Sequence, residues 1–586
     1  MCLQNGTELA LSREASGYFS GHVAGAAAGA RYRFRLDDES TTFPDPASRF
    51  QPEGPHGSSE IVDPTTFAWE DDDWPGLSLT GQVLYEMHIG TFTPEGTWLS
   101  AAKALERLKD LGITAIEMMP VAEFPGGFGW GYDGVDLFAP SHLYGTPDDL
   151  RRFVARAHAL GLGVILDVVY NHFGPDGCYL KSFAPDYFTQ KYKTEWGDAV
   201  NFDGENAAGA REFMIANAQY WIAEFHFDGL RLDATQTIHD SSNPHILACI
   251  SEAAREAAGE RKILMVAENE EQHAALARSP AAGGCGIDAL WNDDFHHSAL
   301  VAMTGHNAAY YSDYAGSPQE FISAAKYGYL FQGQYYAWQD QKRGLPAFDL
   351  DPAQFIVFLE NHDQVANSAA GLRLHQLTSP GLMRAFTALM LLLPGTPMLF
   401  QGQEFQSSKP FLYFADHRGK LGQAVTEGRR KFLAQFPHLT SAEWKPASPS
   451  DPQSFEDCKL DWREFASHLP AVALHRDLLA LRRSDPVFRT QKTRAIDGAV
   501  LGPEAFLLRF FGDEGDDRLL FINYGRDLNY ASIAEPLLSP PADRSWQILW
   551  SSEAVAYGGS GIAPFETGDG LHIPGHAALV LSPAHS

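Results

Sequence analysis

Three patterns of hydrophobic and polar positions follow one another along the chain, and the first covers residues 1–78. In Ala30-Arg-Tyr-Arg-Phe-Arg-Leu36 the apolar residues alternate with polar ones, which places Tyr32, Phe34 and Leu36 on one face of a strand. A stretch rich in Pro and Gly follows at 43–57 and predicts irregular chain. We expect an N-terminal β-sandwich, truncated because its pattern begins abruptly.

The second pattern, over residues 79–494, alternates short apolar runs with helical spacing. Residues 99–111 predict one helix, and a second is expected to start at Thr146, with Pro next to it, and to end at Gly161. Eight runs predict strands, at 83–88, 114–119, 163–169, 229–233, 263–268, 289–292, 355–361 and 397–401. This alternation predicts an α/β fold, a (β/α)₈ TIM barrel with loop insertions. A doubly wound open sheet is the alternative, but no Gly-rich phosphate loop follows the first strand.

The third pattern begins near residue 495, where helical spacing stops. The runs at 506–511, 518–523 and 545–550 predict strands, and Pro and Gly pairs separate them. We therefore expect a C-terminal β-sandwich over residues 495–586.

Composition narrows the classes of function. The 586 residues carry a formal net charge of −30, which disfavours a nucleic-acid partner because phosphates require basic patches. The five cysteines form no CxxC pair, so neither a zinc site nor a disulfide framework is expected. The longest apolar runs are too short to span a bilayer, and the N-terminus lacks the basic and apolar segments of a signal peptide. We expect a cytoplasmic protein with no membrane partner.

Three acidic residues, Asp233, Glu268 and Asp363, end predicted strands of the barrel. Active sites of such barrels lie at the carboxyl ends of the strands, so these acids are expected to meet. Cleavage of a glycosidic bond requires a carboxylate that attacks and a carboxylic acid that protonates the leaving oxygen. The bland alternative is that strand-end acids are solvated or cap helices. This alternative explains any one of the three acids alone better than it explains three acids that end strands of one barrel in order.

Roles follow from the surroundings that the sequence predicts. Arg231 shares a strand face with Asp233, and its charge would keep that nucleophile ionised. Glu268 ends an apolar strand, which raises a carboxyl pKa and suits a general acid. Asp363 is assigned to holding sugar hydroxyls and stabilising positive charge. Its role is the least determined, because the chemistry requires only two carboxyls.

Aromatic and histidine residues near these acids are candidates for sugar contacts. Tyr132, in a Gly-rich loop, is expected to stack on the reacting sugar, and His172 and His362 to donate to its hydroxyls. Packing in the core is the alternative for each of them. A metal site at His172 with Asp167 lacks a supporting ligand spacing, so no metal is predicted.

Four segments, in order, resemble the signature regions of the α-amylase superfamily of glycoside hydrolases. They are Asp167-Val-Val-Tyr-Asn-His172, Gly229-Leu-Arg-Leu-Asp233-Ala, Val266-Ala-Glu268 and Glu360-Asn-His-Asp363. The resemblance implies Asp233 as nucleophile, Glu268 as acid/base and Asp363 as transition-state stabiliser, and it implies that no cofactor is needed. It also implies a retaining mechanism, whose two working carboxyls are typically about 5–5.5 Å apart.

Within that superfamily the chain is most similar to the maltooligosyltrehalose trehalohydrolases. The similarity is carried by Asp45-Pro-Ala-Ser-Arg-Phe-Gln-Pro52, by residues 129–140, by Trp291-Asn-Asp-Asp-Phe-His-His297 and by Asn361-His-Asp-Gln-Val365. The resemblance implies cleavage of the α-1,4 bond next to a terminal trehalose, with maltooligosyltrehalose and α-1,4-glucans as partners. We expect Asn292 and Asp293 to help recognise trehalose. Ala366-Asn-Ser replaces the Gly-Asn-Arg that the family leads us to expect, which leaves fine substrate preference open.

Two other functions remain alternatives. A glycogen-branching or debranching enzyme of the same superfamily would share the barrel and the Trp-Gly-Tyr loop. A non-catalytic glucan-binding protein would have no chemical need for the three acids. Product analysis distinguishes all three. The sequence does not predict an oligomeric state.

Overall fold

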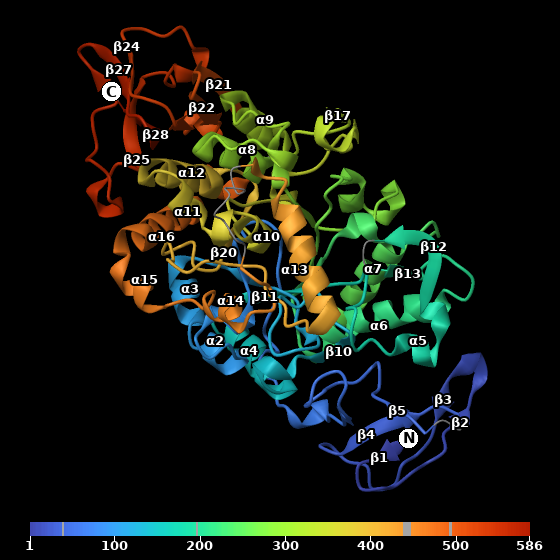
Figure 1. Cartoon of the computed structure of the whole chain (residues 1–586). Coiled ribbons are helices and arrows are strands. Elements are labelled where there is room, and N and C mark those ends of the chain that lie inside the picture. Colours follow the sequence, from blue (N-terminus) through green and yellow to red (C-terminus); the bar gives the residue numbers. More distant parts are fainter. Residues whose placement is uncertain (38–39, 195–196, 438–446, 492–494, 586) are drawn as a thin grey trace.

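The computed structural model describes residues 1–37, 40–194, 197–437, 447–491 and 495–585. A barrel occupies the centre, and β-rich regions lie at its two ends (Figure 1). The predicted fold class, a TIM barrel with flanking β regions, is confirmed. The predicted boundary at residue 494 falls within residues 492–494, outside the described part of the chain.

All eight predicted barrel strands are present and pair in parallel into a closed ring. In chain order they are β7 (Leu84–Met87), β8 (Ala115–Met118), β11 (Gly163–Val168), β14 (Gly229–Leu232), β15 (Leu264–Ala267), β16 (Ala289–Trp291), β19 (Phe355–Val357) and β20 (Thr396–Phe400). β20 pairs with β7 and closes the barrel. Every residue of these strands is buried, as expected where helices cover the outside and side chains fill the inside.

Helices surround the barrel, and larger ones include α4 (Pro147–Ala159), α6 (Ala208–Glu224), α7 (Ile246–Ala258), α8 (Asp293–Thr304), α9 (Pro318–Tyr327), α12 (Pro380–Leu392) and α16 (Leu469–Ser484). The predicted start of α4 is confirmed. Thr146 caps it in a reciprocal pair of hydrogen bonds with Asp149, and Pro147 occupies the first turn. Within the described residues, no helix has both the length and the apolar composition needed to cross a membrane.

The single helix predicted over 99–111 is wrong. The chain forms α2 (Trp98–Ala102) and α3 (Leu105–Leu111), separated at Lys103 and Ala104. The two halves pack on different partners, α2 on α4 and α3 on α16. Helical spacing of apolar residues does not reveal such a break, because both halves keep an apolar face.

The N-terminal region forms a four-stranded sheet from β1 (Cys2–Leu3), β4 (Arg31–Arg35), β5 (Thr42–Phe43) and β6 (Ser59–Glu60), with a separate pair β2 (Ser12–Arg13) and β3 (Phe19–Ser20). The predicted strand at 30–36 corresponds to β4. Its residue Phe34 packs edge-on against Phe183 of α5 (Leu180–Phe183), which follows β11. The alternating face of β4 therefore helps to attach this sheet to the barrel region.

The C-terminal region contains two sheets. Five strands pair in the order β21 (Ile496–Gly502), β22 (Ala505–Phe510), β23 (Arg518–Asn523), β28 (Ala577–His585) and β25 (Arg544–Ser551), and three in the order β24 (Leu528–Tyr530), β27 (Gly570–Ile573) and β26 (Glu566–Thr567). A shared core joins the sheets through residues such as Phe521 and Ile573. The strands predicted at 506–511, 518–523 and 545–550 are confirmed.

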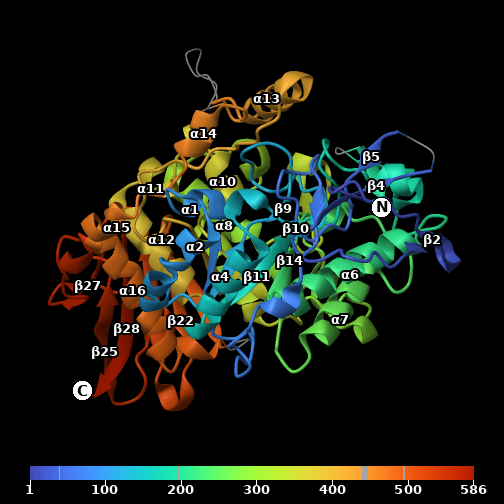
Figure 2. The same cartoon turned by 90° about the horizontal axis from the view of Figure 1, so that it is seen from below.

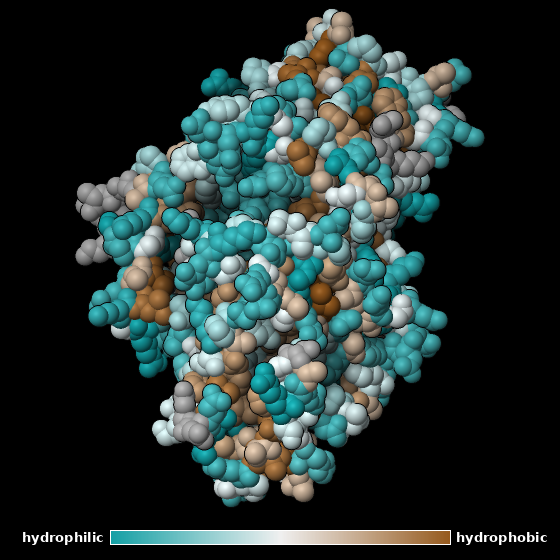
Figure 3. All heavy atoms as spheres, turned by 90° about the vertical axis from the view of Figure 1, so that its right-hand side faces the viewer, coloured by the Kyte–Doolittle hydropathy of each residue, from teal (hydrophilic) through white to brown (hydrophobic). Residues whose placement is uncertain are grey.

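Insertions add further elements around the barrel. They include β12 (Phe188–Thr194) with β13 (Gly197–Val200), the hairpin β17 (Tyr335–Tyr336) and β18 (Gln341–Lys342), and α13 (Gly419–Leu433), which projects from the body of the molecule in Figure 2. Figure 3 shows a mainly hydrophilic face on which hydrophobic residues gather in small patches. Such scattered apolar exposure is ordinary for a protein surface.

Candidate active site

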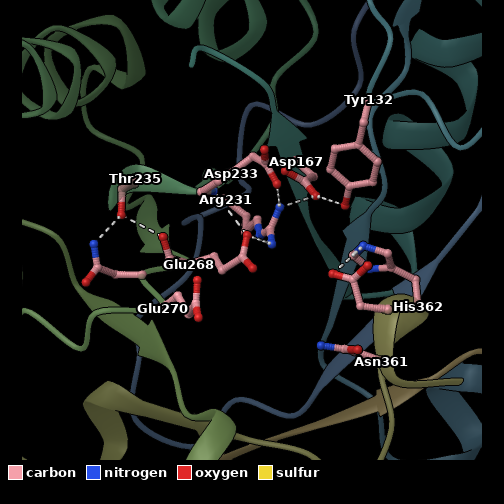
Figure 4. Close-up of polar contacts among 12 residues, drawn as sticks. Tyr132, Asp167, Arg231, Asp233, Thr235, Glu268, Glu270, Asn361 and His362 are labelled. Carbon is pink, nitrogen blue, oxygen red and sulfur yellow. Dashed lines mark hydrogen bonds and ion pairs between the residues drawn. The ribbon is translucent and has the colours of Figure 1, made fainter. Parts of the chain in front are cut away.

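The guanidinium of Arg231 lies at the centre of the carboxylates at the barrel mouth. Its side chain is fully buried on β14. Nη1 donates to Asp167 Oδ2 at 2.7 Å and to Asp233 Oδ1 at 2.9 Å, and Nη2 donates to Glu268 Oε2 at 2.6 Å (Figure 4). The same guanidinium lies 4.1 Å from the centroid of the Trp291 ring. One cation thus serves three carboxyl groups, which disfavours the ionisation of all three at once.

The local sequence places Arg231 and Asp233 on the inner face. Leu230 and Leu232 point outward into the core that the helices cover, so the alternation of the strand turns the two charged residues inward. Asn171 Nδ2 donates to Asp233 Oδ2 at 2.8 Å and to its backbone oxygen at 2.9 Å. Asp233 keeps 13% of its side chain exposed. The carboxylate is therefore held in place by two donors and still reaches the solvent side.

Glu268 follows β15 and is 21% exposed through its side chain. Besides Arg231, the backbone N–H of Ala234 donates to its Oε2 at 3.1 Å. Burial, together with the carboxylates of Asp233 and Asp363, outweighs the opposing effect of Arg231 and raises the pKa of Glu268 to about 8. A carboxyl with this pKa keeps its proton at neutral pH and can donate it.

An aromatic group borders the acids on the other side. The Tyr132 hydroxyl donates to Asp167 Oδ2 at 2.7 Å, and its ring stacks on that of His362 with centroids 5.2 Å apart. Trp130 meets His362 edge-on at 5.0 Å. Asp363 lies in the first turn of α10 (His362–Ala366), and 43% of its side chain is exposed, more than that of either other acid. The structure thus brings Tyr132, His362 and Asp363 to one side of the mouth.

His172 lies at the same mouth, where its Nδ1 contacts Asn171 Oδ1. Burial lowers the pKa of His172, although the carboxylates of Asp233 and Asp133 act in the opposite direction. A neutral imidazole next to Asp233 is suited to hydrogen bonding. His172 therefore adds a hydrogen-bonding group beside Asp233 without adding a charge to the site.

Asn292 does not lie at the mouth, and its expected place beside a sugar is corrected by the structure. Trp291 packs inside the barrel, so the alternation after β16 turns Asn292 outward. The Asn292 side chain is completely buried, and its Nδ2 donates to Gly328 O at 3.1 Å. It lines a separate cavity of about 240 Å³ together with Phe348 and Gly395.

Asp293, one residue further, returns to the inner side and interacts electrostatically with Glu268 and Asp363. Burial raises its pKa to about 7, assisted by neighbouring carboxylates including Glu270 and opposed by Arg343. Arg343 Nε donates to Glu270 O at 2.9 Å. A partly protonated acid beside a cation can therefore accept from or donate to a hydroxyl group here.

The structure gives no support to a metal at these residues. Over the ranges that it describes, His, Cys, Asp and Glu side chains form no group of three or more arranged to hold a metal ion. Asp167, considered with His172 as a ligand pair, accepts from Arg231 and Tyr132 through its Oδ2.

Several site residues were missed in the sequence. Glu86 accepts from His362, Asn171 donates to Asp233, and Glu270 and Arg343 border Asp293. Asn171 stands in the same signature segment as His172, so its position was a usable signal. Arg343 lies far in the sequence from the carboxyl end of any barrel strand, and only the folded chain brings it close.

Comparisons with known proteins identify the relatives of this chain. The family model for the alpha amylase catalytic domain matches residues 62–197, and a domain of unknown function (DUF3459) matches residues 493–580. The chain is 43% identical to a malto-oligosyltrehalose trehalohydrolase of Deinococcus radiodurans over 531 residues, which cover 89% of this chain and 85% of that protein. It is 42% identical to the enzyme of the same name from Saccharolobus solfataricus over 457 residues, 77% of this chain and 78% of the other.

A crystal structure described as a putative alpha amylase from Salmonella typhimurium is also similar. It superposes with a TM-score of 0.86 at 35% identity and covers 98% of this chain and 94% of its own. At these identities, over most of both chains, the chain belongs to the malto-oligosyltrehalose trehalohydrolase family of α-amylase-type glycoside hydrolases.

Proposed function

We propose that this protein hydrolyses the α-1,4-glucosidic bond between a maltooligosaccharide and a terminal trehalose, through the carboxyls of Asp233 and Glu268. The observation that carries the proposal is the sharing of Arg231 by both groups, with contacts of 2.9 and 2.6 Å. One guanidinium spans the two carboxyls, so they lie close enough to act on one bond. That closeness favours the retaining course, since inverting enzymes need room for a water molecule between them.

In the first step, Glu268 donates its proton to the glycosidic oxygen and Asp233 attacks the anomeric carbon. The C–O bond breaks, trehalose leaves with the proton, and a glycosyl ester forms on Asp233. The pKa of about 8 supplies the proton on Glu268, and Arg231 supports the charge on Asp233 before attack.

In the second step, the ionised Glu268 takes a proton from water, and the resulting nucleophile attacks the same carbon. The ester bond to Asp233 breaks, a maltooligosaccharide leaves, and Glu268 is protonated again. Asp363 stabilises the positive charge of each transition state. Tyr132, His172 and His362 hold the sugar whose bond is cleaved.

We assign Asp293 to the leaving side, where it helps to recognise trehalose, and we leave Asn292 out of the substrate-contacting set. Supporting this, Asp293 faces Glu268 and Asp363 while Asn292 is buried against Gly328. α-1,4-Glucans are the proposed alternative substrates. The cytoplasmic location, the lack of nucleic-acid and membrane partners and the lack of a cofactor stay predictions from the sequence.

Product analysis tests the activity. The protein is incubated separately with maltotriosyl-trehalose, maltopentaose and amylose, and the sugars are separated. Trehalose and maltotriose from the first, with much slower cleavage of the others, are the expected products. New α-1,6 branches in amylose would instead identify a branching enzyme, and no turnover of any substrate would favour the glucan-binding alternative.

A further inference from the structure

The buried carboxylate of Glu86 makes a double contact with His362 that the mechanism above does not use. Glu86 lies on β7, and its side chain is 2% exposed, as is that of His362. Its Oε1 is 2.6 Å from Nδ1 of the ring, and its Oε2 accepts from the backbone N–H of His362 at 3.0 Å. One side chain of the first barrel strand thus fixes both the ring and the start of α10.

The second ring nitrogen of His362 also faces a carboxylate. Nε2 lies 3.4 Å from Asp363 Oδ2. A neutral imidazole has only one N–H, so one of its nitrogens would direct a lone pair at a carboxylate. When both nitrogens carry protons, Nδ1–H donates to Glu86 and Nε2–H lies within ion-pair distance of Asp363. The geometry alone therefore favours the imidazolium form.

The other groups around the ring do not replace Glu86. Burial raises the pKa of the Glu117 carboxyl well above its usual value, so that group stays protonated. Burial lowers the pKa of His88 to about 4, and Arg231 disfavours a second cation nearby. Burial would lower the pKa of His362 as well, but Asp363 and Glu86 outweigh burial and raise it to about 9.

We propose that Glu86 is a positioning residue that holds His362 as an imidazolium and directs its Nε2–H toward Asp363 and the bound sugar. The charge state of His362 is independent of any substrate, whereas the contact with sugar rests on the proposed function. Loss of the Glu86 charge should leave His362 neutral at working pH, with a lone pair facing Asp363 or a wrongly placed proton.

The direct test is nitrogen NMR of the substrate-free, histidine-labelled protein, in which His362→Asn identifies the His362 signals. At about pH 7.5 we expect both ring nitrogens of His362 to be protonated in the wild type and one to be deprotonated in Glu86→Gln. A neutral His362 in the wild type at this pH would overturn the proposal, even if the variant did not fold.

The second test is the pH dependence of kcat/KM on maltotriosyl-trehalose. For Glu86→Gln we expect a loss of roughly 10- to 100-fold at about pH 7.5, the usual effect of losing a hydrogen bond to a charged group, and recovery towards wild type at lower pH. A loss that is equal at every pH would show a purely structural role and would also overturn the proposal. Inactivity of the wild type would contradict the proposed function and leave the NMR result standing.

Glu404→Gln is the matched control. Glu404 is also buried, and its carboxyl accepts from Tyr85, the neighbour of Glu86 on β7, at 3.0 Å. The substitution removes a buried acidic group that is bound to the same strand and has no direct contact with His362. Its pH profile is expected to run parallel to that of the wild type.

Discussion

Two clusters of mostly buried charged side chains lie at opposite ends of β14, and they differ in how completely their charges are paired. The base cluster is formed before the strand by Asp71, His158, His226 and Asp228. The mouth cluster follows it and contains Asp167, Arg231, Asp233, Glu268, Asp293, His362 and Asp363. Aspartate and histidine side chains thus occur in both clusters, at the two ends of one strand.

The acidic and histidine side chains of the base cluster all have hydrogen-bond partners. His158 contacts Asp71 at 2.7 Å and Asp228 at 2.9 Å, and Asp228 also accepts from Trp74 Nε1 at 2.7 Å and from the Val164 N–H at 2.9 Å. Although burial acts to raise the pKa of Asp71, its hydrogen bonds to His158 and His226 lower it to about 2. Ionisation is therefore favoured here, and the cluster stabilises the fold.

The mouth cluster has too few cations for its acids. Burial raises the pKa of three of them, Glu268 to about 8, Asp293 to about 7 and Asp167 to about 6, in spite of neighbouring arginines. The folded state therefore destabilises their charged forms, which a purely structural cluster would avoid. These two clusters therefore differ in the direction of the carboxyl pKa shift, which is downward for Asp71 at the base and upward for three acids at the mouth, as is common at functional sites.

The largest expected effect is on turnover. Asp233→Asn or Glu268→Gln removes a reacting group and should lower kcat by roughly 10²- to 10⁴-fold or more, while the melting temperature stays equal or rises. Steady-state kinetics with maltotriosyl-trehalose and thermal unfolding measure both quantities. Retention of full activity in either variant would remove that residue from the mechanism.

A substitution in the base cluster should lower stability and leave turnover unchanged. Asp228→Ala leaves His158 and two N–H donors without their partner and should cost about 3–5 kcal/mol of unfolding free energy. The kcat at temperatures well below melting should remain unchanged, because Asp228 lies at the other end of the strand. Denaturant unfolding provides the measurement. A stable variant would show that the base cluster does not hold the fold together.

The two clusters should also respond differently to pH. The depressed pKa of Asp71 contributes stability that is present above about pH 4 and is lost as the pH falls toward 2. The raised pKa of His158 contributes stability that is present below about pH 6.5 and is lost as the pH rises through its folded pKa. Melting temperatures should therefore be highest between these limits, and His158→Gln should flatten the alkaline side.

Catalytic activity, in contrast, should persist to a higher pH than the maximum of the melting temperature. The proton on Glu268 is lost as the pH rises through about 8, so kcat/KM should fall there. A pH–rate profile with its alkaline limb near the usual carboxyl pKa, about 4 to 5, would contradict the role of the mouth cluster.

The smallest expected effect is on the preference for maltotriosyl-trehalose over maltopentaose. Asp293→Asn should reduce the rate on maltotriosyl-trehalose relative to maltopentaose by roughly tenfold, the typical effect of losing one charged hydrogen bond. It should also move the alkaline limb to lower pH, because Asp293 is one of the acids that raise the pKa of Glu268. An unchanged ratio between the two substrates would show that Asp293 does not recognise trehalose.

Much of the barrel was predictable because its strands are short, apolar and bounded by loops. The same rule located Asp233, Glu268 and Asp363, since residues that end parallel strands must meet at one edge. Because side chains alternate between the two faces of a strand, Asn292 is expected to point outward when Trp291 points inward. Applied one residue past β16, this alternation would have corrected the expectation that Asn292 helps to recognise trehalose.

Contacts between distant segments were not predictable. Glu86 and His362 are separated by 276 positions, and nothing near Glu86 in the sequence distinguishes it from an ordinary strand residue. The excess of acids over cations at the mouth likewise depends on burial and distance. These quantities exist only once the barrel has closed.

The most direct test of the account is the anomeric configuration of the first product. Proton NMR during hydrolysis of maltotriosyl-trehalose distinguishes α- from β-maltotriose before mutarotation. The account predicts α-maltotriose, since displacement by Asp233 followed by water retains the configuration. Initial release of β-maltotriose would contradict the role of Asp233 as nucleophile.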